Sequence, residues 1–188
     1  MKNLIYLSLL SAVFLFTACD SSIKLFREND HNWLQEGDAK WTFNGNELIG
    51  ESTEGSSFIM TKNIYGNFEL NLEFYPDSTV NSGVFLRCKE HKVDALDCHE
   101  INIWDLHPNQ DFRTGSVVTK AVPLVKVNTL EQWNTYRIKA QNDSVWVWLN
   151  DIKTAEIENK SLKEGYIGLQ AAGTGTIKFR NVSLKPVQ

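Results

Sequence analysis

Between residues 68 and 75 apolar and polar side chains alternate with a period of two, and this alternation most limits what the chain can fold into. The even positions hold Phe, Leu, Leu and Phe, and the odd positions hold Glu, Asn, Glu and Tyr. In an extended strand the two sets point to opposite faces, so one face is buried and the other meets water. Half-buried strands of this kind are typical of antiparallel sheets.

Further short segments rich in β-branched and aromatic residues follow along the chain, separated by turn sequences such as Asn44-Gly45 and Asn150-Asp151. No segment has the 3.6-residue apolar period of an amphipathic helix. The 188 residues suffice for one well-buried domain. The sequence therefore predicts an all-β, two-sheet antiparallel sandwich. The expected strands include residues 48–50, 58–61, 68–75, 82–88, 98–105, 133–140, 144–149, 167–170 and 176–184.

The first residues have the pattern of a secretory signal. A lysine at position 2 precedes an apolar stretch at 4–16, and two small residues then lead to Cys19. The Phe-Thr-Ala-Cys ending resembles a bacterial lipobox, in which the cysteine carries a lipid, although Phe16 stands where leucine is usual. We predict a lipid on Cys19 and, as a result, a protein anchored in a bacterial cell envelope, periplasmic or outer-membrane. Secretion without a lipid is the alternative.

The boundaries follow from that signal. The expected parts are a lipoprotein signal peptide at 1–18, a tether at 19–27 and a single β-sandwich domain at 28–188.

The chain has three cysteines. If Cys19 carries lipid, Cys88 and Cys98 remain as a pair, with a charged, loop-like segment between them. Two strand ends joined by such a loop can bring the sulfurs into bonding range, and an exported protein meets oxidising conditions. We therefore predict a disulfide between Cys88 and Cys98.

The formal net charge of −4 gives no electrostatic reason to expect a nucleic acid partner, which needs a basic surface. We expect a monomer that meets a membrane through the lipid.

The segment from Cys98 to Gly115 carries the residues most suggestive of a site. Its first half alternates as a strand, with Glu100, Asn102 and Trp104 on one face. A carboxylate, an amide and an indole in a row suit a groove that holds a sugar, since carboxylates and amides are rarely buried without partners. The alternative is an edge strand with a solvated face.

Four other side chains of this segment form a weaker candidate site, for a divalent metal with oxygen and nitrogen ligands. They mix strand and loop positions without a specific spacing, so no cofactor is assigned with certainty. These residues are His99, Asp105, His107 and Asp111.

Seven phrases, in their order along the chain, resemble the bacterial DUF1080 family, which is associated with cleavage of 3-keto-glycosides. The resemblance covers about residues 33–186. It implies a jelly roll of the concanavalin A-like lectin and glucanase type, with the ligand on the concave sheet. The phrases are residues 65–70, 81–87, 99–105, 114–118, 131–136, 168–170 and 179–181.

The chain departs from the family at one place. Many members continue after Gly-Leu-Gln with Asp-His-Gly, whereas here Ala171 and Ala172 precede Gly173. Two polar side chains at the rim of the expected groove are therefore missing. A non-catalytic, lectin-like carbohydrate-binding module is the alternative to an enzyme for this reason.

The chemistry implied by the resemblance assigns roles to particular residues. A ketone at C3 acidifies the hydrogen on C2, so the enzyme needs a base near C2 and a cation or donor near O3. Loss of the C2 proton allows elimination of the glycosidic oxygen, and water then adds to the product. We expect Glu100 as the general acid or base and Arg87 as the cation; a plain Arg87–Glu100 salt bridge is the alternative. The expected substrate contacts are Asn102, Trp104 (or core packing for this indole), Gln170 and Lys120, which is also the second candidate cation.

Overall fold

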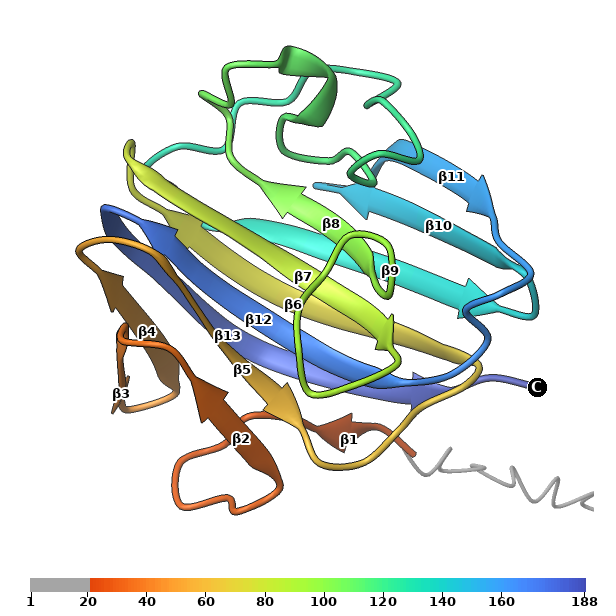
Figure 1. Ribbon diagram of the computed structural model, residues 1–188, viewed down its shortest axis with the longest axis horizontal. Coiled ribbons are helices and arrows are strands. Elements are labelled where there is room, and N and C mark those ends of the chain that lie inside the picture. Colours follow the sequence, from red (N-terminus) through yellow and green to blue (C-terminus); the bar gives the residue numbers. More distant parts are fainter. Residues whose placement is uncertain (1–20) are drawn as a thin grey trace, which may run out of the picture.

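A computed structural model describes residues 21–188 of the chain, almost entirely as antiparallel strands (Figure 1). The elements are β1 (Ile23–Lys24), β2 (Trp33–Glu36), β3 (Lys40–Asn44), β4 (Glu47–Ser52), β5 (Ser56–Thr61), β6 (Phe68–Pro76), β7 (Val80–Cys88), β8 (His99–Ile103), the 3-10 turn η1 (Gln110–Phe112), β9 (Asn134–Gln141), β10 (Ser144–Leu149), β11 (Ile152–Glu158), β12 (Tyr166–Gly173) and β13 (Gly175–Pro186). No helix within this part of the chain is long and apolar enough to cross a membrane.

The strands form two sheets that pack face to face, which confirms the predicted sandwich. The large sheet has eight strands in the order β11-β10-β9-β6-β13-β4-β3, with β1 paired to β13. The small sheet has five strands in the order β2-β5-β12-β7-β8. Consecutive strands repeatedly change sheet, so β7 and β8 lie in one sheet while β6 and β9 lie side by side in the other (Figure 1).

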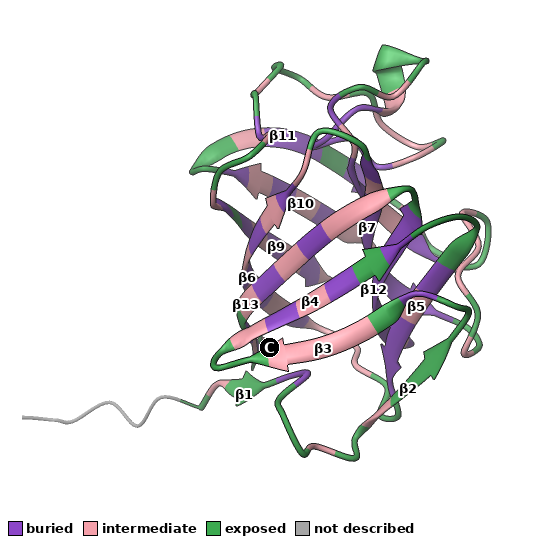
Figure 2. Ribbon diagram, turned by 90° about the vertical axis from the view of Figure 1, so that its left-hand side faces the viewer, coloured by how far each residue is buried: buried purple, intermediate pink, exposed green. Residues whose placement is uncertain are grey.

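The apolar and polar residues that alternate in the sequence are alternately buried and partly exposed in the sheet. Along β6, apolar side chains are buried while the polar ones are partly exposed, as predicted. Figure 2 shows the same banding along β4 and β13. Removing these apolar side chains from water is the main force that holds the two sheets together. The core they form includes Phe68, Leu70, Phe74, Val84, Ile101, Ile103, Ile138, Val147, Leu169 and Phe179.

The turns also adopt the backbone conformations that their residue types predict. Asn150 and Asp151 join β10 to β11 with φ values of 49° and 64°, the left-handed region that these two residue types tolerate. The short turn between β9 and β10 places Asn142 in the same region. These turns set the register of the hairpins and therefore which side chains reach each face.

The amino-terminal boundary differs from the prediction. The signal peptide and the lipidation at Cys19 lie outside the described residues. Part of the expected tether belongs to the domain, because Ile23 and Lys24 pair with β13, and Leu25 and Phe26 are buried. The reason is burial of apolar side chains, since an exposed tether would leave Leu25 and Phe26 in water.

The predicted disulfide between Cys88 and Cys98 is confirmed. It closes the loop of residues 89–97, which folds back over the outer face of the small sheet (Figure 1). Val93 of this loop packs against a small apolar cluster that includes Met60, Phe85 and the two cysteines, and the His91 ring lies on Tyr166 with centroids 3.9 Å apart. The loop is therefore a wall beside β8.

Candidate functional site

The candidate site lies on the outer face of the small sheet around β8, here named the Glu100 face. Glu100 pairs with Phe85 of β7, Phe85 pairs with Gly168 of β12, and Gly168 pairs with Met60 of β5. Partners in register point to the same face of a sheet, and the neighbours Ile101 and Val84 face the core. This row therefore gives Glu100 an apolar surface along one side.

A glycine leaves room next to this carboxylate. Gly83 faces outward beside Glu100 and Asn102, and a Cβ at this position would lie 3.6 Å from Glu100 Cγ and 3.4 Å from the Phe85 ring. A glycine within a strand often marks a place where a ligand or another backbone comes close. This glycine is a signal that sequence reasoning missed.

Glu100 is half-buried, and its carboxylate accepts no hydrogen bond from any side chain or backbone group of residues 21–188. Burial raises the pKa of Glu100 to about 7, against the opposing effect of the Lys120 ammonium. Burial penalises the ionised form because the surroundings solvate charge less well than water does. A carboxyl group with this pKa can take up and release a proton near neutral pH.

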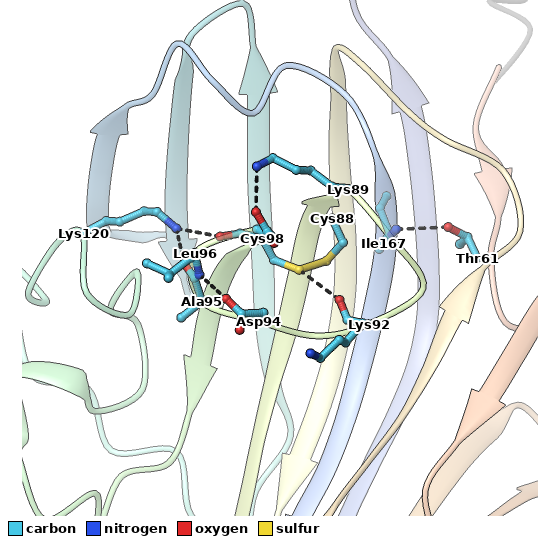
Figure 3. Close-up of a disulfide and its surroundings, with 11 residues drawn as sticks. Thr61, Cys88, Lys89, Lys92, Asp94, Ala95, Leu96, Cys98, Lys120 and Ile167 are labelled. Atoms are coloured by element: carbon cyan, nitrogen blue, oxygen red, sulfur yellow. Dashed lines mark hydrogen bonds and ion pairs between the residues drawn. A yellow bond between two sulfur atoms is a disulfide. The ribbon is translucent and has the colours of Figure 1, made fainter.

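Lys120 is the cation that the fold brings to Glu100. Its Nζ donates to the backbone oxygens of Ala95 at 2.7 Å and Cys98 at 2.6 Å (Figure 3). These two bonds hold the ammonium against the disulfide-closed loop and leave one of its three protons free. Burial lowers the pKa of Lys120, while Glu100 and Asp94 act to raise it. Glu100 and Lys120 thus form a coupled acid and base pair.

The prediction for Arg87 is wrong. Its side chain is fully buried, and its five N–H groups are used by the backbone oxygens of Gly66, Asn142 and Leu162 and by the Asn67 side chain. Arg87 has a φ of 52° beside an irregularity in the pairing of β7 and β12, which breaks the alternation and turns the side chain away from the Glu100 face. The alternative of an Arg87–Glu100 salt bridge is excluded for the same reason.

Asn102 lies on the expected face, but its amide is occupied. Nδ2 donates to the backbone oxygen of Phe112, Oδ1 accepts from Ile103 N, and only 2% of the residue is exposed. The residue therefore anchors the loop after β8 and has little left for a sugar, contrary to the prediction. The free edge of β8 is also covered, since residues 115–118 hydrogen-bond along it.

Trp104 does not pack in the main core; it is half-buried in an aromatic group at the end of β8. Its ring meets His107 edge-on at 4.5 Å, and His107 meets Phe112 at 5.7 Å. Four residues of extended chain separate Trp104 from Glu100, a distance of about 13 Å. The proposed role of Trp104 as a platform for a sugar face remains a prediction.

Gln170 faces outward beside Gly83, since its neighbour Leu169 pairs with Val84. Its Nε2 donates to Ser56 Oγ at 3.0 Å, and its buried Oε1 has no partner within residues 21–188. A buried acceptor without a partner is costly, so a ligand or water is expected to satisfy it. Gln170 thus keeps one free polar group for binding.

The two alanines that replace the family's Asp-His pair do not share a position. Ala171 points into the core, where a Cβ on Gly50 would lie 3.0 Å from it, whereas Ala172 pairs with Asn81. The expectation that both mark the rim of a groove is therefore wrong for Ala171. Alternation along β12 allows only position 172 to face outward.

The four metal candidates do not come together. His99 is fully buried, and Asp105 binds Thr129 and Arg113. His107 belongs to the aromatic group, and Asp111 lies on the exposed turn η1. Within residues 21–188 no three His, Cys, Asp or Glu side chains could hold a metal ion. His99 cannot join the other three because alternation along β8 points its side chain toward the interior.

Opposite pH effects are expected from the neighbours Glu100 and His99. The pKa of Glu100 is raised from 4.5 to about 7, so its proton stabilises the fold as the pH falls through 7 toward 4.5. Burial, with the charges of Lys120 and Arg87, lowers the pKa of His99 from 6.5 to about 4, so acid favours the unfolded chain as the pH falls below 6.5. Glu100→Gln removes the first effect alone. We expect the unfolding temperature of this variant to fall more steeply with acid than that of the wild type; parallel curves would contradict the assignment.

Comparison with known proteins matches nearly the whole described chain to one protein family. A family described as a 3-keto-alpha-glucoside-1,2-lyase-like domain matches residues 21–185. A candidate glycosyl hydrolase from Parabacteroides distasonis has 26% sequence identity and a TM-score of 0.78, over 89% of this chain and 100% of that one. A second candidate glycosyl hydrolase from this organism has 20% identity and a TM-score of 0.72, over 84% of this chain and 89% of that one.

A carbohydrate-binding module from Bacillus subtilis shares the fold, with 18% identity and a TM-score of 0.64 over 85% of this chain and 99% of that one. The search of curated proteins found no match.

Proposed function

The chain belongs to the 3-keto-alpha-glucoside-1,2-lyase-like domain family, and on this premise we propose that it cleaves 3-keto-glycosides at the Glu100 face. The relative with 26% identity, a candidate glycosyl hydrolase, supports the broader assignment to carbohydrate chemistry. One observation carries the finer proposal: a half-buried carboxyl group with a pKa of about 7 lies near an ammonium group held by two backbone oxygens.

In the first step, ionised Glu100 takes the proton from C2. The electron pair of the C–H bond moves toward the carbonyl at C3, and negative charge develops on O3. With its pKa near 7, Glu100 is both sufficiently ionised and sufficiently basic at neutral pH. The free proton of the Lys120 ammonium is the donor available to the developing charge.

In the second step, the bond between C1 and the glycosidic oxygen breaks as a double bond forms between C1 and C2. The leaving oxygen needs a proton, which Glu100 now carries and can return. The product is a 2-hydroxy-glucal with its C3 ketone, and water can add to the double bond to complete hydrolysis. No net oxidation or reduction occurs.

A lectin-like carbohydrate-binding module is the second candidate. The alanine at position 172 favours it, because the outward position on β12 lacks the polar side chain that many family members carry. A binding module needs Trp104 and Gln170 but has no use for a base.

Hydrogen exchange at C2 separates the two candidates. We expect the purified protein in D2O to replace the C2 hydrogen of methyl 3-keto-α-glucoside with deuterium and to release methanol, both followed by NMR. The unoxidised methyl α-glucoside is the matched control, because without the C3 ketone its C2 hydrogen is not acidic. Binding of the keto sugar without exchange or methanol release would support the module and refute the enzyme.

We also propose that the protein works in the bacterial cell envelope, lipid-anchored at Cys19. The lipobox-like sequence at residues 16–19 supports the anchor. The disulfide between Cys88 and Cys98 is typical of proteins that fold in oxidising compartments.

A further inference from the structure

The outer face of the large sheet, on the opposite side of the molecule from the Glu100 face, carries an ordered polar surface. One row crosses four strands, from Trp148 on β10 through Arg137 on β9 and Asn71 on β6 to Ser183 on β13. The next row has Thr135, Glu73 and Arg180. Neither row has a role in the chemistry at Glu100.

A cavity of about 380 Å³ lies over these rows. Its lining includes short polar side chains, those of Asn71, Thr135 and Ser183. The other polar residues of the lining are Glu73, Arg137, Asp151 and Asn181. A second cavity of about 510 Å³ shares Asn181 and Ser183 with it and lies beside β1 and the β3–β4 hairpin. Its lining includes core residues such as Leu25, Leu48 and Phe179, so it is not part of the polar surface.

Arg137 is one wall of the smaller cavity. Its guanidinium carbon stacks 3.7 Å from the centre of the Trp148 ring, which fixes the plane of the group. The nearest carboxylate oxygen, on Glu69, is 3.8 Å away, too far for a hydrogen bond. The guanidinium makes no hydrogen bond to residues 21–188, and 38% of the side chain is exposed. Its charge is paired with Glu69, but its N–H donors are oriented and make no hydrogen bond to residues 21–188.

The other wall is built around Glu73. Its carboxylate accepts from Arg180 Nη2 at 2.6 Å and from the Asn181 side chain at 2.5 Å. Arg180 in turn stacks 3.9 Å from the Trp133 ring. Burial acts to raise the pKa of Glu73, but the bonds from Asn181 and Arg180 outweigh it and hold the pKa below its ordinary value. The Glu73 carboxylate oxygens are therefore held in a fixed position, by Asn181 and by an Arg180 side chain that stacks on the Trp133 ring.

The lining of the smaller cavity has one cation, Arg137, and two carboxylates, Glu73 and Asp151. Glu73 is paired with Arg180, and Arg137 is paired with Glu69 outside the lining. The lining therefore has no excess positive charge to attract an anion. Donors and acceptors are mixed within one depression, which suits vicinal hydroxyl groups that both donate and accept.

We propose that the outer face of the large sheet is a second saccharide site, which binds a neutral oligosaccharide at the smaller cavity and is separate from the Glu100 face. The inference does not depend on the reaction proposed at Glu100. Its consequence is that the protein can hold a glycan on one side while the other side is free.

NMR of the indole N–H groups tests this site, because the chain has six tryptophans and the two sites involve different ones. The probes are maltohexaose, cellohexaose and laminarihexaose. We expect at least one of them to shift the Trp133 and Trp148 signals while leaving Trp104 in place. No shift with any probe at millimolar concentration, or a shift of Trp104 alone, would overturn the proposal.

A matched pair of variants sharpens the result. Arg137→Ala removes the cation that lines the cavity, whereas Lys139→Ala removes the equivalent cation over Trp146, one row away and outside the cavity. We expect Arg137→Ala to weaken binding of the active probe at least tenfold and Lys139→Ala less than twofold, with equal unfolding temperatures. Glu100→Gln should leave this binding unchanged.

Asn71→Ala, in the lining of the cavity, gives a second measurement that does not alter charge, and we expect it to weaken binding as well. Equal losses in the Arg137 and Lys139 variants would refute a defined site. Binding to phosphatidylglycerol vesicles that disappears in Arg137→Ala, without oligosaccharide binding, would identify a lipid surface and overturn the proposal.

Discussion

Glu100→Gln is expected to lower kcat for a 3-keto-glucoside by about 10²–10⁴-fold, the usual contribution of a general base. Glutamine keeps the shape of the side chain but cannot accept the C2 proton. A steady-state assay of product release measures the loss. Glu36→Gln, in the strand at the far edge of the same sheet, is the matched control and should keep full activity. Loss of activity in both variants, or in neither, would rule out Glu100 as the base.

The pH profile of the wild type gives an independent check of the same residue. Because the ionised carboxylate is the base and burial raises its pKa to about 7, kcat/KM should rise with pH through about 7. Lys120 lowers the pKa of Glu100, so Lys120→Met should move this rise to higher pH. A rise centred near the ordinary value of 4.5 would show that another group is the base.

Arg87→Met is expected to have the largest effect on stability, a loss of about 3–5 kcal/mol in the free energy of unfolding. The guanidinium ties together three chain segments through the carbonyls of Gly66, Asn142 and Leu162. Methionine fills part of the volume but leaves these buried acceptors without donors, and each such loss is costly.

Urea denaturation of Arg87→Met and Arg137→Met shows whether the loss in the free energy of unfolding comes from the buried hydrogen bonds or from the loss of a positive charge. Both variants lose one positive charge, but Arg137 lies on the surface with its side chain 38% exposed, so we expect a change below about 1 kcal/mol there. A folded Arg87→Met protein of wild-type stability that has lost turnover would reverse our conclusion and return Arg87 to the active site.

Local patterns predicted those parts of the fold that local physics controls. The period of two along β6 determines its buried face, because successive side chains of a strand must point to opposite sides. Asn150 and Asp151 tolerate positive φ, so they could be recognised as a turn without any tertiary information. Cys88 and Cys98 could be paired because only a short loop separates them.

The errors arose where a single residue breaks a local rule. Alternation along β7 predicts an outward Arg87, but one residue with positive φ at an irregular pairing turns its side chain away. Asn102 does face outward, and what sequence reasoning missed was the carbonyl of Phe112, ten residues later, which occupies its amide. Neither the bulge nor the loop conformation follows from residue types alone, since both depend on neighbouring strands.

The sequence by itself determined the sandwich class, the buried faces of the long strands, the disulfide and a strand carrying Glu100, because each depends on residues close together in the chain. Only the tertiary structure decided which cation meets Glu100. Lys120 is twenty positions away in the sequence and reaches the site by bonding to the loop that the disulfide closes. The pKa of Glu100 was also decided there, because burial and the distance to a charge are properties of the packed sheet.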